Sequence, residues 1–253
     1  MKTVYYSDEL NDDFAPKKRS RPKIDKNYVY APASLWWRFW AFIVYRIIMT
    51  PAACLYCLFR FGMKIKKSRK PEKKKGCMVY CNHTMLIGDA FAPSFALFPK
   101  KVCVIVAPEN LSAKSTSWFL KMSGAIPLPD GLAAMKNFNG AIKQRLNENC
   151  AVAVYPEAHV WPFYTKIRPY PSASFKFAVQ NNVPAYASTA TYQKRKLFGT
   201  KVTLYIDGPF YPDTSLSPKE AEQKLRNEIY AVMCSRAENS TYAPVNYVLR
   251  KEQ

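Results

Sequence analysis

The stretch MVYCNHTMLIGDAF, residues 78–91, decides the fold of this chain. It opens within an apolar run that is typical of a buried β-strand, and from Asp89 onward the apolar spacing becomes helical. A strand, a turn and a helix in succession form the unit from which α/β domains are built. Asn82 and His83 follow the strand directly, where α/β sheets carry their functional residues.

Apolar runs and helical segments alternate along the rest of the chain. The runs predict strands at residues 77–81, 102–107, 151–155, 184–190 and 201–206. The helical spacing predicts helices at residues 89–97, 116–121, 132–147, 172–181 and 217–237. We therefore expect an α/β fold with a mixed, partly parallel central sheet flanked by helices, preceded by a membrane-associated helical pair.

The chain divides by composition into three parts. Residues 1–33 are polar and basic and include the run KKRSR at residues 17–21, so we expect a tail without regular secondary structure. Residues 34–63 are predicted as an interfacial apolar motif of two helices. Residues 64–253 are predicted as the α/β domain.

Leu35 to Phe61 is the most apolar segment, and about 20 apolar residues suffice to span a bilayer. Three arginines interrupt it: Arg38, Arg46 and Arg60. An arginine at the centre of a spanning helix costs at least about 2.5–3.5 kcal/mol. We therefore expect two shorter helices, hinged near residues 50–51, that enter one leaflet of a membrane. A true span and a pair of core helices in a soluble domain are the alternatives.

The charge balance is strongly basic: 38 Lys and Arg against 18 Asp and Glu, a formal net charge of +20. Such a chain is attracted to nucleic acid, to an anionic membrane surface or to an acidic carrier protein. Basic runs at residues 64–70 and 73–75 follow the apolar segment directly, which favours an anionic lipid surface over a solvated linker. No nucleic-acid-binding motif appears, so we do not expect nucleic acid as a partner.

The seven cysteines are an odd number, and no secretory signal opens the sequence. We therefore expect reduced thiols in a cytosolic setting. We expect no metal site, because histidine and carboxylate side chains are scarce near the cysteines.

The chain contains only two histidines, His83 and His159. His83 and Asp89 would point roughly 240° apart on a continuous helix and lie about 20 Å apart along a strand. They meet only if the chain turns between them, and we expect Gly88 to supply that turn. Their contact would orient the imidazole and leave its other nitrogen free to take a proton from a hydroxyl. The alternative is that Asp89 only caps a helix and His83 is an ordinary loop residue.

These residues resemble the glycerolipid acyltransferase family, which includes the lysophosphatidic acid (1-acylglycerol-3-phosphate) acyltransferases. Residues 82–89 resemble the first motif of that family, Asn-His-x-x-x-x-Asp, and Tyr155-Pro156-Glu157 resembles its third, Phe-Pro-Glu-Gly-Thr-Arg-Ser. Residues 124–128, GAIPL, stand where the second motif would fall, and residues 172–185 resemble the helix and strand that close the domain. The resemblance covers residues 76–190. Within the family, the chain is similar to a divergent bacterial-type member.

The sequence departs from the family pattern at three points. One extra residue separates His83 from Asp89, so the turn must be wider. The third and second motifs lack the arginines that grip the acceptor's phosphate in the family. Lys166, Arg168 and Lys176 are the candidate substitutes, with Arg168 preferred because a guanidinium binds phosphate bidentately. Ordinary surface cations are the alternative for all three.

The resemblance implies that residues 64–253 form an acyltransferase domain for phospholipid biosynthesis. A fatty acyl group would pass from acyl-CoA or acyl carrier protein, as co-substrate, to a hydroxyl of a lysophospholipid-like acceptor such as 1-acylglycerol-3-phosphate. His83 and Asp89 would be catalytic, without a cofactor. The substrate-binding residues would be Asn82, Thr84, Glu157, His159, Lys166, Arg168 and Lys176. His159 has a packed loop histidine as its alternative. The protein would lie on the cytoplasmic face of the cell membrane, peripherally or monotopically.

Two other functions stay open at this point. A lipid hydrolase would use the same pair of residues on water and would release free acid without an acceptor. A basic membrane-binding or nucleic-acid-binding protein with a decayed motif would tolerate His83→Ala, and its affinity for nucleic acid would fall steeply with salt.

Overall fold

The computed structural model describes residues 2–15, 20–112, 114–195 and 199–250. A seven-stranded sheet with the order β2-β8-β7-β3-β6-β4-β5 forms the centre of the protein. The pairs are parallel except β7 with β8, which is antiparallel. The strands are β2 (Lys64–Lys67), β3 (Cys77–Cys81), β4 (Val102–Val106), β5 (Ala125–Pro127), β6 (Ala151–Val154), β7 (Ala185–Lys194) and β8 (Thr200–Phe210).

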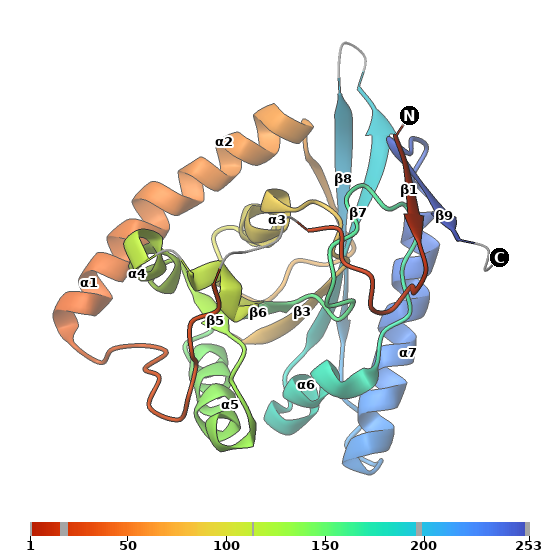
Figure 1. Cartoon of the computed structure of the whole chain (residues 1–253). Helices are drawn as coiled ribbons and strands as arrows, with labels where there is room; N and C mark the ends of the chain where they lie inside the picture. Colours follow the sequence, from red (N-terminus) through yellow and green to blue (C-terminus); the bar gives the residue numbers. More distant parts are fainter. Residues whose placement is uncertain (1, 16–19, 113, 196–198, 251–253) are drawn as a thin grey trace.

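Side chains alternate in direction along each strand, so the apolar strands present apolar side chains on both faces of the sheet. Helices cover both of these faces (Figure 1). Met78 and Tyr80 of β3 belong to one core cluster, together with residues of helices α5 (Leu132–Asn147), α6 (Lys176–Asn181) and α7 (Pro218–Ala237). Cys77, Val79 and Cys81 belong to the other, together with residues of α2 (Thr50–Phe61) and α3 (Ile87–Leu97). The helices after the first strand of the sheet are α3 (Ile87–Leu97), α4 (Lys114–Met122), α5 (Leu132–Asn147), α6 (Lys176–Asn181) and α7 (Pro218–Ala237), with 3-10 turns at Pro108–Leu111 and Ser172–Phe175.

The predicted α/β architecture, a mostly parallel sheet flanked by helices, is confirmed. The bounds of α5 agree with the predicted helix at residues 132–147. Strands β2 and β5 were not predicted; both lie at the edges of the sheet and have few residues.

The apolar N-terminal segment is one continuous helix, so the prediction of two helices hinged near Pro51 is wrong. It runs through α1 (Leu35–Ile43), a π-helical stretch η1 (Val44–Met49) and α2 (Thr50–Phe61). The π-helical turn widens the helix just before Pro51, which lets the proline ring fit without a break. The helix, Leu35–Phe61, is 27 residues long and apolar enough to cross a membrane.

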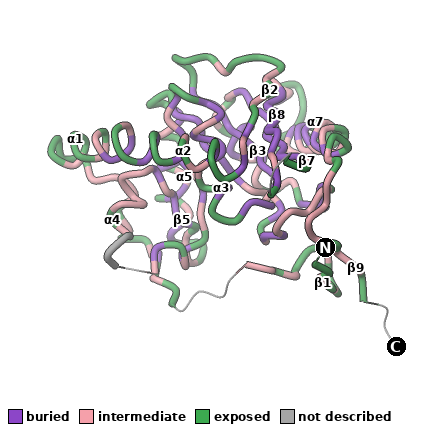
Figure 2. Tube along the Cα trace, turned by 90° about the horizontal axis from the view of Figure 1, so that it is seen from above, coloured by how far each residue is buried: buried purple, intermediate pink, exposed green. Residues whose placement is uncertain are grey.

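This helix buries only one stripe of its surface. Tyr45, Met49, Ala53, Cys57 and Phe61 recur every four residues and are buried. Much of the opposite side is exposed, as Figure 2 shows for α1. Its exposed apolar residues include Trp36, Phe39, Phe42, Ile47, Ile48, Leu55, Leu58 and Phe59.

Residues 2–6 correct the prediction of an unstructured tail. They form strand β1 (Lys2–Tyr6), which pairs in parallel with β9 (Val245–Leu249) in a separate two-stranded sheet. Farther along, Ile24 is buried and its N–H donates to Asp130 Oδ2 at 2.6 Å. Residues 17–19 of the predicted basic run lie outside the described residues. The division of the chain into three domains stays a prediction.

The basic region after α2 is held to the domain. Its first residues, Lys64–Lys67, form edge strand β2, where exposed lysines discourage pairing with a further strand. Lys100 Nζ donates to the main-chain carbonyls of Glu72, Lys73 and Lys75. The Lys100 ammonium group therefore holds the loop that follows β2 against the domain.

Candidate active site

Strand β3 delivers Asn82 and His83 to the carboxyl-terminal edge of the sheet. The Asn82 side chain is buried, accepts from the Ala190 N–H at 2.8 Å and donates to the Ala190 carbonyl at 3.1 Å. Thr84 is also buried, and its hydroxyl lies 2.6 Å from that of Tyr192. Both side chains therefore join the loop to β7, and their predicted role in substrate binding stays a prediction.

The structure brings His83 and Asp89 together. His83 Nδ1 lies 2.7 Å from Asp89 Oδ2, and the same carboxylate oxygen accepts from the Met85 N–H at 2.9 Å. The Asp89 side chain is 3% exposed and that of His83 20%. Because Asp89 holds Nδ1, the opposite nitrogen, Nε2, is the one left to accept a proton.

The turn between the two residues is made by Leu86, not by Gly88 as predicted. Leu86 has φ 53° and ψ −115°, close to the first central residue of a type II′ turn, and the Gly88 N–H closes that turn on the Met85 carbonyl at 3.0 Å. Positive φ is strained for leucine.

Gly88 has a steric role instead. A Cβ at position 88 would lie 2.9 Å from both Phe61 Cε2 and Met85 Cβ. The glycine therefore lets α3 approach the end of α2 closely.

We expect Gly88→Ala to lower the free energy of unfolding by about 1–3 kcal/mol, because the added methyl overpacks this contact. Gly140→Ala is the control: position 140 is exposed in α5 and a Cβ there meets no atom within 4 Å, so it should stabilise by about 0.5–1 kcal/mol. Denaturant unfolding measures both. Equal effects of the two substitutions would contradict the steric role of Gly88.

Tyr155, which follows β6, contacts both members of the pair. Its ring centroid lies 4.5 Å from that of His83 at an interplanar angle of 33°, and its hydroxyl donates to the Asp89 main-chain carbonyl. Sequence reasoning did not assign this residue a role. The sequence did contain a signal: a tyrosine stands at the position where the third motif of the family has phenylalanine.

Glu157 and Arg168 form a buried pair beneath the His83 loop. The Glu157 carboxylate accepts from the His83 N–H at 3.1 Å, from the Arg168 N–H at 3.2 Å and from the Arg168 guanidinium at 3.3 Å. Burial raises the pKa of Glu157, while the Arg168 cation and the two N–H donors act in the opposite direction. Glu157 therefore fixes the backbone of His83.

The burial of Arg168 contradicts the prediction that this residue binds the acceptor's phosphate. Its side chain is 1% exposed and its guanidinium also donates to the carbonyls of Glu9, Glu157 and His159. It lies 4.9 Å from the ring of Trp161 as well. The Arg168 cation, which the sequence suggested as a partner for the acceptor's phosphate, is therefore paired with groups inside the protein.

The three remaining predicted residues are spread out. His159 Nδ1 lies 3.6 Å from the Asp13 carboxylate, and the side chain is about one-third exposed. Lys166 is exposed on the same loop. Lys176 begins α6, beside Phe177, and its electrostatic partner Glu222 is on α7. The contacts described for Lys176 thus lie on α6 and α7, not at the His83 loop.

The ends of the chain hold the loop that contacts His83. The Trp161 N–H donates to the His83 carbonyl at 3.1 Å, and the Trp161 indole donates to the Asp12 carbonyl at 2.7 Å. Tyr247 of β9 stacks on Trp161 with a centroid distance of 4.9 Å, and its hydroxyl donates to the Pro162 carbonyl. β1, β9 and residues 7–15 therefore support the active-site loop from outside.

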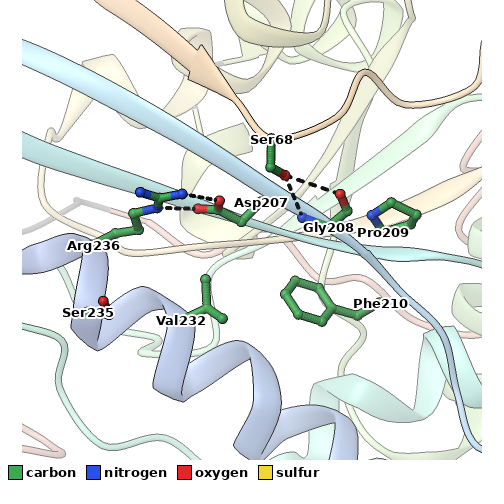
Figure 3. Close-up of a pocket in the computed structure, with 8 residues that line it drawn as sticks. All are labelled: Ser68, Asp207, Gly208, Pro209, Phe210, Val232, Ser235 and Arg236. Atoms are coloured by element: carbon green, nitrogen blue, oxygen red, sulfur yellow. Dashed lines mark hydrogen bonds and ion pairs between the residues drawn. The ribbon is translucent and has the colours of Figure 1, made fainter.

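A hollow between β8 and α7 is lined by none of the predicted site residues (Figure 3). Asp207 accepts two hydrogen bonds from Arg236, at 2.6 and 2.8 Å, and Ser68 pairs with the main chain of Gly208. Its two charged side chains are paired with each other, and we assign no substrate to it.

Within the described ranges, no group of three or more His, Cys, Asp or Glu side chains is arranged to hold a metal ion. All seven cysteines are free. The apolar surroundings of Cys81, next to the site, raise the pKa of its thiol to about 12, so the thiol is protonated at neutral pH.

Comparisons with known proteins bear on the family and on the fold of the chain. The model of a family described as Acyltransferase matches residues 62–189, about half of the chain. The crystal structure of the 1-acyl-sn-glycerophosphate (LPA) acyltransferase PlsC from Thermotoga maritima superimposes with a TM-score of 0.58 at 16% identity, over 81% of this chain and 83% of that chain. That similarity shows the fold. No curated protein matches the chain significantly. The matched segment contains the strand, turn and helix that carry His83 and Asp89, and the chain belongs to the acyltransferase family.

Proposed function

We propose that this acyltransferase moves a fatty acyl group from a thioester to a hydroxyl of a lysophospholipid-like acceptor, with His83 and Asp89 as a catalytic pair. The observation that carries the proposal is the 2.7 Å contact between His83 Nδ1 and Asp89 Oδ2, with the imidazole still partly exposed. A histidine held in this way acts as a general base.

The reaction balances with these two residues alone. His83 Nε2 takes the proton of the acceptor hydroxyl while the oxygen attacks the thioester carbonyl carbon. The carbon–sulfur bond breaks, and the imidazolium returns the proton to the leaving thiolate. Asp89 orients the ring and stabilises the imidazolium in between. No serine or cysteine nucleophile is required.

Apolar surface beside the pair suits lipid substrates. Leu86 and Ile87 follow the His83 loop, and Ile87 is 63% exposed. The donor is proposed to be acyl-CoA or acyl carrier protein, both of them polyanions that a chain of net charge +20 attracts. The acceptor implied by the family resemblance, 1-acylglycerol-3-phosphate, is the first to assay.

The test is an acyl-transfer assay with purified protein, an acyl thioester and a panel of lysolipids. We expect ester formation and thiol release in equal amounts, both dependent on the acceptor. Thiol release with free acid and without any acceptor would favour the hydrolase and overturn this proposal.

We also propose that the Leu35–Phe61 helix lies in the interface of an anionic membrane, on its cytoplasmic face, without spanning it. Its stripe from Tyr45 to Phe61 is packed against the domain, so the helix cannot cross a bilayer without drawing the domain in with it. The exposed apolar residues, with Trp36 at 71% and Phe59 at 74%, would enter the lipid.

We expect the triple variant Trp36→Ser, Phe39→Ser, Phe59→Ser to bind anionic vesicles at least about tenfold more weakly, because each side chain loses its burial in lipid. Tyr5→Ser with Leu249→Ser is the control, since these exposed apolar residues lie on β1 and β9. Vesicle co-sedimentation measures both. Unchanged binding of the triple variant would rule out this helix as the membrane contact.

A further inference from the structure

Helix α3 leaves the main-chain carbonyl of Asp89 without its ordinary partner. In an α-helix this carbonyl would accept from the N–H four residues later. That residue is Pro93, inside α3, and proline has no N–H. Asp89 is buried, so an unpaired carbonyl there is costly.

Tyr155 supplies the missing donor. Its hydroxyl donates to the Asp89 carbonyl from the end of β6, the strand that pairs with β3. Burial raises the pKa of Tyr155 well above its ordinary value, so the hydroxyl keeps its proton. One side chain thus links β6 to the first turn of α3 at the residue that contacts His83.

The ring of the same tyrosine lies against the His83 imidazole at 4.5 Å. We propose that Tyr155 is a positioning residue of the active site: its hydroxyl replaces the hydrogen bond that Pro93 removes from Asp89, and its ring holds the plane of His83. This inference rests on the proposed function. A phenylalanine would fill the same space, so the hydroxyl is the group to be tested.

We expect Tyr155→Phe to lower kcat about tenfold with little change in KM, because the first turn of α3 can shift and misplace Asp89. Tyr80→Phe is the matched control. Tyr80 is a buried tyrosine whose hydroxyl also points to a main-chain carbonyl, that of Ser174, on the opposite face of the sheet. It should retain the wild-type kcat. Equal kcat in wild type and Tyr155→Phe would overturn the proposal.

A rescue variant separates this role from general packing. Pro93→Ala restores an N–H four residues after Asp89, so Tyr155→Phe should cost much less in the Pro93→Ala background than in the wild type. The same loss in both backgrounds would contradict the proposed link between Pro93 and Tyr155.

A readout independent of activity separates this inference from the proposed function. With only two histidines, the imidazole N–H signals in an NMR spectrum are easily assigned. The His83 Nδ1 proton should exchange with solvent faster in Tyr155→Phe than in wild type or Tyr80→Phe, and unchanged exchange would overturn the inference. If wild type transfers no acyl group to any acceptor, the proposed function fails, and this measurement still decides the role of Tyr155.

Discussion

His83→Ala is expected to lower kcat by about 10²–10⁴-fold, the usual contribution of a positioned general base. Asp89→Asn should cost a similar factor, because an amide at Nδ1 stabilises the wrong imidazole tautomer. The two residues act as one unit through the 2.7 Å contact, so the double variant should be little worse than either single one. Steady-state acyl transfer at saturating donor and acceptor measures all three.

The control is Asp213→Asn, a loss of carboxylate charge at the surface near the start of α7, where Asp213 pairs with Lys224. It should leave kcat unchanged. Comparable Tm values for His83→Ala and wild type establish that the fold persists. If His83→Ala then forms product at the wild-type rate, the catalytic assignment is wrong.

Arg168→Met is expected to destabilise the protein by about 3–5 kcal/mol, because it leaves the Glu157 carboxylate buried without its cation. The two side chains are 1% and 0% exposed, so solvent cannot replace the arginine. Lys224→Met is the control, since it breaks the exposed pair with Asp213 and should hardly change Tm.

The pH dependence of the Tm deficit distinguishes the unpaired Glu157 carboxylate from a simple loss of packing as the cause. Burial raises the pKa of Glu157 above the ordinary 4.5, so the folded state binds a proton more readily than the unfolded state does. The cost of burying the ionised carboxylate is full above the folded pKa and falls as the pH drops through it. Without Arg168 the pKa rises further. The deficit of Arg168→Met in Tm should therefore be larger at pH 7.5 than at pH 5, and an equal deficit at both values would exclude the charge as its cause.

Local patterns were sufficient to predict the inner strands of the sheet, though not its edge strands β2 and β5, and to predict the contact between His83 and Asp89. The central strands are buried on both faces, so each is a continuous apolar run that stands out in the sequence. The contact follows from a strand, a turn and a helix within residues 77–97. Each of these features depends on neighbours along the chain.

The errors concern groups whose partners are distant or whose conformation carries no local signature. Leucine gives no indication of positive φ, so Gly88 was the natural choice for the turn that Leu86 makes. Arg168 resembles a surface cation until its partner Glu157 is seen to be buried. Pro51 predicts a hinge only if the helix before it is an ordinary α-helix. The preceding stretch η1 is π-helical instead.

The pairing of β1 with β9 has a consequence for the order of folding. Lys2 pairs with Val245, so β1 leaves the ribosome long before its partner strand does. Tyr247, which stacks on Trp161, also follows both catalytic candidates along the chain. A nascent chain that already contains His83 and Asp89 therefore still lacks the support that β9 gives to the loop that contacts His83.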